Sequence, residues 1–147
     1  MRMSKWLAAL LTLSAGVIAA DNMPWTFNGQ RAEGYSIDLI SVEPAAGTPL
    51  VRGSSVEIKI NAKYAMSIKP EGQVFLVIQD EKNKRVEATK TPASIPVTAG
   101  DGTLTLTAMI AEVPKSKEIR VFVPLSPKGL EETNGEIVIR YPIVKKR

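Results

Sequence analysis

Residues 55–64 read SVEIKINAKY and alternate strictly between apolar and polar side chains. Ile58 and Ile60 fall on one side of the pattern, and Glu57 and Lys59 fall on the other. Because successive side chains of a β-strand point to opposite faces, this alternation predicts a strand with one buried face. A shift of one residue would bury the charges and expose the isoleucines, so we expect a firmly fixed register.

Other segments of the chain carry similar patterns. Together with a strand at 54–64, the sequence predicts strands at 36–42, 73–79, 85–89, 103–111, 118–125 and 136–144. These segments are short, rich in β-branched residues and separated by turn-forming residues, and no helical period occurs after residue 20. Seven such segments predict an all-β, antiparallel sandwich.

The inward faces of these strands are expected to meet in one core between two sheets. The same reasoning identifies inward-facing apolar residues on two other predicted strands, 73–79 and 118–125. The predicted core residues are Val56, Ile58, Ile60, Val74, Leu76, Ile78, Ile119, Val121 and Val123.

Four stretches carry a resemblance to a known class of domain. They read ISVEPAAGTPLVRGSSVEIKINAKY (40–64), GQVFLVIQD (72–80), AGDGTLTLTA (99–108) and EIRVFVPL (118–125). They resemble an immunoglobulin-like module of exported bacterial proteins, similar in layout to fibronectin type III domains. The resemblance covers 36–144 and implies a seven-stranded antiparallel immunoglobulin-like β-sandwich that serves as a spacer, adhesive or accessory domain. It is specific for the fold and not for one function.

The N-terminus has the three parts of a secretory signal peptide. Arg2 and Lys5 precede an uncharged run, 6–20, which ends in small residues. This run is shorter than the roughly 20 apolar residues of a membrane-spanning helix, so we expect cleavage after Ala20. The protein is therefore expected to be exported, to the periplasm or alternatively to the cell surface or medium.

Cleavage divides the chain into three parts. We predict a signal peptide at 1–20, an N-terminal tether with little regular structure at 21–35, and the immunoglobulin-like domain at 36–147. No further membrane-spanning candidate follows the signal peptide. The mature chain carries a net charge of only +2, because the signal peptide takes two basic residues from the total of +4. A charge this small gives no reason to expect nucleic acid as a partner.

The composition excludes several kinds of chemistry. The 147 residues include no cysteine and no histidine. Thiol nucleophiles, disulfides, the usual zinc sites and a Ser-His-Asp triad are therefore absent. The sequence predicts a non-catalytic protein that needs no cofactor.

Two metal sites are weighed as alternatives. The stretch SVEPAAGTPL (41–50) resembles the opening of small periplasmic copper carriers, and Met23, Met66 and Met109 offer soft ligands. A small periplasmic ligand or metal carrier is therefore the alternative function. The ordinary interpretation of scattered methionines is that they fill gaps in a core.

One turn also offers oxygen ligands. Asp80, Glu81 and Asn83 are close enough in sequence to collect a calcium ion, but their spacing is not that of a twelve-residue calcium loop. Lys82 and Lys84 oppose a cation there. We expect a solvated turn and no metal site.

The third, sixth and seventh predicted strands break the alternation, because they carry apolar residues on both faces. Their outward apolar side chains are Phe75, Val77, Phe122 and Val138. These strands are neighbours in an immunoglobulin-like order, so the four side chains should cluster. Such a patch indicates a binding surface for another envelope protein or for a second copy of the chain. Alternatively, the tether folds back and covers the patch with Trp25 and Phe27.

Overall fold

The computed structural model describes residues 24–130 and 135–147, so the predicted signal peptide lies outside the described part. Every regular element in the described ranges is a β-strand. The strands are β2 (Thr26–Asn28), β3 (Tyr35–Glu43), β4 (Leu50–Val51), β5 (Val56–Phe75), β6 (Val77–Asp80), β7 (Thr89–Thr91), β8 (Ser94–Ile110), β9 (Glu118–Pro127) and β10 (Glu136–Val144). Within these ranges, no helix is long and apolar enough to cross a bilayer.

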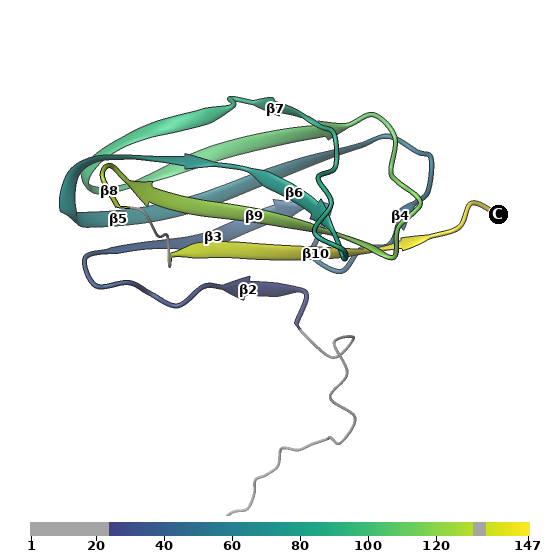
Figure 1. The fold of residues 1–147 in the computed structure, drawn as a ribbon, viewed down its shortest axis with the longest axis horizontal. Coiled ribbons are helices and arrows are strands. Elements are labelled where there is room, and N and C mark those ends of the chain that lie inside the picture. Colours follow the sequence, from purple (N-terminus) through teal and green to yellow (C-terminus); the bar gives the residue numbers. More distant parts are fainter. Residues whose placement is uncertain (1–23, 131–134) are drawn as a thin grey trace, which may run out of the picture.

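The strands form two layers that are joined at one end. The first layer has the antiparallel order β3-β5-β8-β7, and the second has the order β6-β9-β10-β2. Strand β5 belongs to both layers: its first part pairs with β3, and its last residues, Gly72 to Val74, pair with β9. Figure 1 shows β5 and β8 bending together at the left-hand end of the molecule.

This strand order confirms the predicted fold class. In an immunoglobulin constant-type sandwich, strands A, B, E and D form one sheet and strands C, F and G form the other. The chain supplies β3, β5, β8 and β7 for the first set and β6, β9 and β10 for the second. The protein is therefore an antiparallel immunoglobulin-like β-sandwich with seven principal strands, to which β2 and β4 are added.

The core follows the predicted alternation. Ile58 and Ile60 have no exposed surface, while Glu57 and Lys59 are exposed. Of the nine predicted core residues, eight are buried and Val56 is half-buried. Burial of each large aliphatic side chain contributes about 1.5–3 kcal/mol, so this face fixes the register of β5.

Several predicted strand boundaries were wrong. The fourth predicted strand, 85–89, is not a strand; Arg85 forms only an isolated bridge with Gln79, and β7 begins at Thr89. The fifth begins at Ser94 and not at 103. Between residues 94 and 103, proline and glycine interrupt the apolar–polar alternation that marks a strand. The strand nevertheless extends through this stretch, because its first residues pair with β5. The second predicted strand continues into the long β5, which ends at Phe75, so the third predicted strand, 73–79, is divided between the end of β5 and β6.

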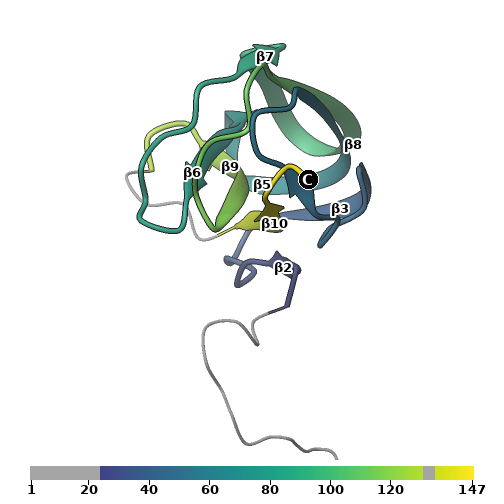
Figure 2. The same cartoon turned by 90° about the vertical axis from the view of Figure 1, so that its right-hand side faces the viewer.

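The segment predicted as an irregular tether contains the short strand β2. This strand pairs antiparallel with β10, and β4 pairs with β10 in parallel farther along the same strand. Between them, the Gly47 amide donates a 2.9 Å hydrogen bond to the Arg140 carbonyl. Figure 2 shows β2 at the periphery, beside β10 and outside the body of the sandwich.

Candidate binding surface

The predicted apolar patch forms a row across the outer face of the second layer. Phe122 on β9 pairs with Val77 on β6 and with Val138 on β10, and Val138 pairs with Phe27 on β2. Residues opposite each other in an antiparallel sheet project from the same face, so these side chains are direct neighbours. We call Val77, Phe122, Val138 and Phe27 the outer row.

The outer row is most exposed at its β2 end. Val77, Phe122 and Val138 are half-buried, whereas Phe27 is 50% exposed. Phe75 is also half-buried and lies two residues before Val77, alternating with the buried Val74. The structure therefore brings together Val77, Phe122 and Val138, whereas Phe75 is paired with Ser94 on β8. The row ends at the exposed ring of Phe27.

The described part of the tether, from residue 24 onward, lies beside the patch. Strand β2 extends the second layer sideways, so Phe27 continues the outer row as a fourth member. Trp25 lies beside the row and packs on Gly47, where an added Cβ would lie 2.9 Å from Trp25 Cγ. The Arg140 guanidinium carbon is 5.6 Å from the centre of the Trp25 ring, which is a cation–π contact. The tryptophan remains 40% exposed.

A charged cluster adjoins the outer row on the same face. Arg140 Nη2 donates to Glu118 Oε2 at 2.6 Å, and Arg120 Nε donates to Glu118 Oε1 at 2.5 Å. The side chains of Arg140 and Glu118 are only 9% and 11% exposed. Burial raises the pKa of Glu118, but hydrogen bonds from the two arginines outweigh it and hold the pKa below its ordinary value. The cluster fixes the charged side chains next to the apolar row.

Sequence reasoning missed this cluster. Its signal was present, because Glu118 and Arg120 occupy outward positions of one strand and Arg140 occupies an outward position of the next. What the sequence did not provide was the register that pairs Arg120 with Arg140. Only that register brings the single carboxylate between the two guanidinium groups.

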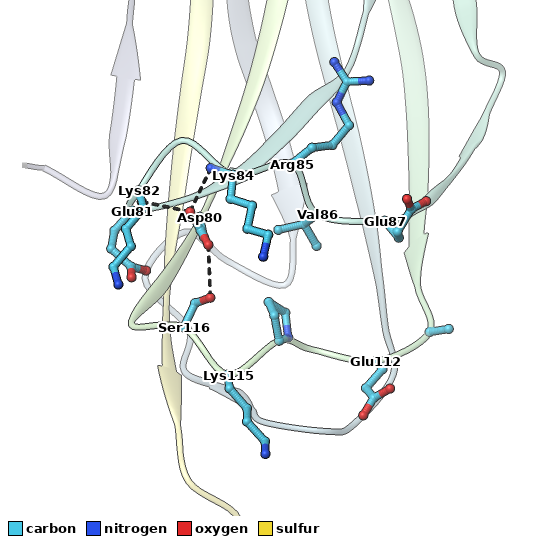
Figure 3. A pocket seen from close by; sticks show the side chains of 12 residues that line it. Asp80, Glu81, Lys82, Lys84, Arg85, Val86, Glu87, Glu112, Lys115 and Ser116 are labelled. Atoms are coloured by element: carbon cyan, nitrogen blue, oxygen red, sulfur yellow. Dashed lines mark hydrogen bonds between the residues drawn. The ribbon is translucent and has the colours of Figure 1, made fainter.

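A second concave region lies at the end of the sandwich beyond β6. It is an open cleft of about 720 Å³ between the turn at 80–87 and the segment at 111–116 (Figure 3). Asp80 Oδ1 accepts hydrogen bonds from the amides of Lys82 and Lys84 at 2.8 and 2.9 Å, and Oδ2 accepts from the Ser116 hydroxyl at 3.3 Å. These bonds, led by the one from Lys84, lower the pKa of Asp80. The carboxylate therefore stabilises the turn.

The calcium alternative receives no support from this turn. Glu81 Oε1 accepts hydrogen bonds from the amides of Lys117 and Glu118 at 2.9 and 3.2 Å, so it also holds a neighbouring segment. Within the described ranges, no three side chains among His, Cys, Asp and Glu are grouped to hold a metal ion. Asp80 and Glu81 therefore act as hydrogen-bond acceptors for backbone amides.

The two methionines in the described residues are far apart. Met66 is buried and pairs with Gly100, whereas Met109 is 40% exposed and pairs with Glu57. Nine rungs of the same ladder separate them, which corresponds to roughly 30 Å. They cannot ligate the same copper ion within one chain.

Comparison with known proteins assigns no family. No family model matches the chain, and no curated protein matches it. Among solved structures, a C. elegans member of the MSP family shares 15% identity at a TM-score of 0.39, covering 71% of this chain and 96% of that one. A family 123 glycoside hydrolase from Clostridium perfringens shares 12% identity at a TM-score of 0.35, covering 77% of this chain but 27% of that one. These likenesses are too distant to carry an argument about function.

Proposed function

We propose that the protein is a non-catalytic, exported binding module of the cell envelope, and that it holds a partner protein on the outer row. The observation that carries this proposal is the alignment of Val77, Phe122, Val138 and Phe27 in register across four neighbouring strands. Contiguous apolar surface that ends in exposed aromatic rings is typical of protein interfaces.

The neighbouring charges complement this role. A protein interface combines an apolar centre with a polar rim, and arginine is enriched at such sites. Here Arg120, which is 28% exposed, borders the apolar row, and the buried Glu118–Arg140 pair beside it is held by a 2.6 Å hydrogen bond. A partner would therefore meet a preorganised surface, which lowers the conformational entropy lost on binding.

The test is the double variant Phe75→Ser and Phe122→Ser, which removes the ring inside the outer row and the ring two residues before its member Val77. Truncation of a buried phenylalanine costs about 3–5 kcal/mol, and we expect about half of that for each of these half-buried rings. The matched control is Met109→Ser, because Met109 is an exposed apolar residue on the first layer. Thermal melts of each variant show whether the domain remains folded before binding is compared.

The binding readout is affinity capture from an envelope extract, followed by a binding measurement with the purified partner. We expect the double variant to lose partner binding at least tenfold and the Met109→Ser control to retain it. A folded double variant that binds the same partner with unchanged affinity would refute the outer row as the binding surface.

Export is tested separately. The signal-peptide pattern at 1–20 leads us to expect a mature chain that begins near Asp21. The intact mass of the protein isolated from its natural compartment checks this. A mass that retains residues 1–20 would reject cleavage.

A further inference from the structure

Strand β2 is attached to the sandwich without entering its core. It pairs with β10 at three residues, Thr26, Phe27 and Asn28. None of the three is buried, and the buried hydrophobic core begins at Tyr35. Within the described residues, the other edge of β2 pairs with no strand. The strand can therefore leave β10 without opening the core.

The body of the domain carries an acceptor site that fits this strand. The Arg140 amide donates a 2.7 Å hydrogen bond to the Trp25 carbonyl, and the Gly29 amide donates to the Glu136 carbonyl at the other end. The Trp25 ring rests where Gly47 has no side chain, and an alanine there would place Cβ 2.9 Å from the ring. The site thus recognises an extended Trp-x-Phe segment through its backbone and its first aromatic ring.

The connector between β2 and β3 allows this arrangement within one chain. Residues 29–34 lead from the second layer to the first and reverse the chain direction, as Figure 1 shows at the left-hand end of the molecule. Packed sheets lie about 10 Å apart, so the connector must span that distance while it turns. Its contacts lie mostly at its two ends: the Gly29 amide bonds to β10, and the Gly34 carbonyl accepts hydrogen bonds from the amides of Ser67 and Ile68. Between them, Arg31 forms an exposed ion pair with Asp38, and Ala32 packs against the core.

We infer that residues 24–28 form an exchangeable arm, which seats either on its own β10 or on the β10 edge of a second copy. The arm of a second copy has the sequence that this edge already binds in the structure. Exchange between two copies reproduces every arm contact in a two-fold, self-complementary dimer. When the arm leaves, the unpaired amides and carbonyls of β10 provide the driving force for another strand to bind.

The balance between the two states depends on the connector. A short flexible connector holds its own arm at an effective concentration on the order of millimolar, so the closed monomer dominates in dilute solution. A connector that is too short to turn between the layers prevents the arm from binding its own β10, so the arm can bind only the β10 of a second copy. Deletion of residues 30–33 leaves only Gly29 and Gly34 between the strands, which is insufficient to reverse direction and cross about 10 Å.

The first experiment is sedimentation equilibrium of the mature chain with and without this deletion. We expect the deletion to lower the dimer dissociation constant at least a hundredfold while the circular dichroism spectrum remains unchanged. The control combines the deletion with Trp25→Ala, which removes the ring that packs on Gly47 and should restore the monomer. A folded deletion variant that remains monomeric at millimolar concentration, or a dimer unaffected by Trp25→Ala, would overturn the inference.

The second experiment detects exchange in chains with the full connector. The protein has no cysteine, so a chain with Phe27→Cys can be mixed at high concentration with a chain carrying Val138→Cys and treated with a short thiol crosslinker. These positions are paired in the structure, so exchange should yield a mixed crosslinked dimer. Met109→Cys, on the first layer, replaces Val138→Cys in the control. Equal yields from both mixtures would contradict exchange.

This inference concerns the edge of β10 and not the outer face, so it does not depend on the proposed function. Failure of arm exchange would leave partner capture by the outer row unaffected. Loss of partner capture in the Phe75→Ser and Phe122→Ser variant would likewise leave the arm and its acceptor site intact.

Discussion

The charged cluster on the second layer offers a sharp energetic test. We expect Glu118→Ala to lower the free energy of unfolding by about 3 kcal/mol, at the lower end of the range for a broken buried ion pair. The lower end applies because Arg120 is 28% exposed and retains solvent contact. The matched control is Glu71→Ala, since Glu71 pairs with Lys128 at 3.4 Å but both side chains are mostly exposed. That variant should stay within about 0.5 kcal/mol of the parent.

Urea unfolding followed by circular dichroism measures both variants. The pKa of Glu118 is lower in the folded chain than its ordinary value of 4.5, so its contribution is present above about pH 4.5 and is lost as the pH falls through the lowered pKa. The difference between the parent and Glu118→Ala should therefore shrink as the solution is acidified. Equal unfolding midpoints for Glu118→Ala and Glu71→Ala at pH 7 would show that the buried pair stabilises no more than a surface pair.

Three further predictions test the core and the sheet face. Ile58→Asp should cost several kcal/mol because it places a charge in the core, whereas Glu57→Ala should stay within about 0.5 kcal/mol; equal effects in urea would show that the register is wrong. Tyr141→Phe should cost about 1 kcal/mol, because the buried Tyr141 donates a 2.7 Å hydrogen bond to the Pro44 carbonyl; an unchanged thermal melt would exclude a net contribution from this bond. Burial raises the pKa of Glu136 above 4.5, so the folded chain binds more protons than the unfolded chain and stability falls as the pH rises through that interval. Glu136→Gln should therefore be more stable than the parent at neutral pH and lose that advantage below about pH 4.5; a variant less stable at both pH values would contradict this sign.

The strands with one buried face were predictable because their pattern has a single physical cause. Ile58 and Ile60 alternate with charged residues. A strand with one face on the core buries the isoleucines and leaves the charged side chains in water. The seventh predicted strand, 136–144, matches β10 to the residue although it is apolar on both faces, because it is rich in β-branched residues and follows a turn signal. Reasoning from the sequence failed where pairing at an edge decides the structure. Strand β2 has no buried residue and only three paired positions, so no periodic signal marks it.

The candidate surface was predictable in its members but not in its arrangement. Broken alternation identified Val77, Phe122 and Val138 as outward apolar residues, and strand order made them neighbours. The sequence did not show that Phe27 aligns with Val138, because that pairing joins residues more than a hundred positions apart. The contact between Trp25 and Gly47 was equally inaccessible, since a glycine in a loop gives no indication of which ring it accommodates.

Strand β10 connects the two proposals, and its geometry decides whether they can operate together. Its outward side chain Val138 belongs to the outer row, while its edge carries the arm. In an exchanged dimer, the Phe27 of the second copy takes the same place beside Val138, because every arm contact is reproduced. The outer row would then be completed by two chains without changing its shape. Partner binding should therefore have the same affinity for the closed monomer and for the dimer formed by deletion of 30–33. A partner that binds only one of the two forms would show that Phe27 of the arm occupies a different position after exchange.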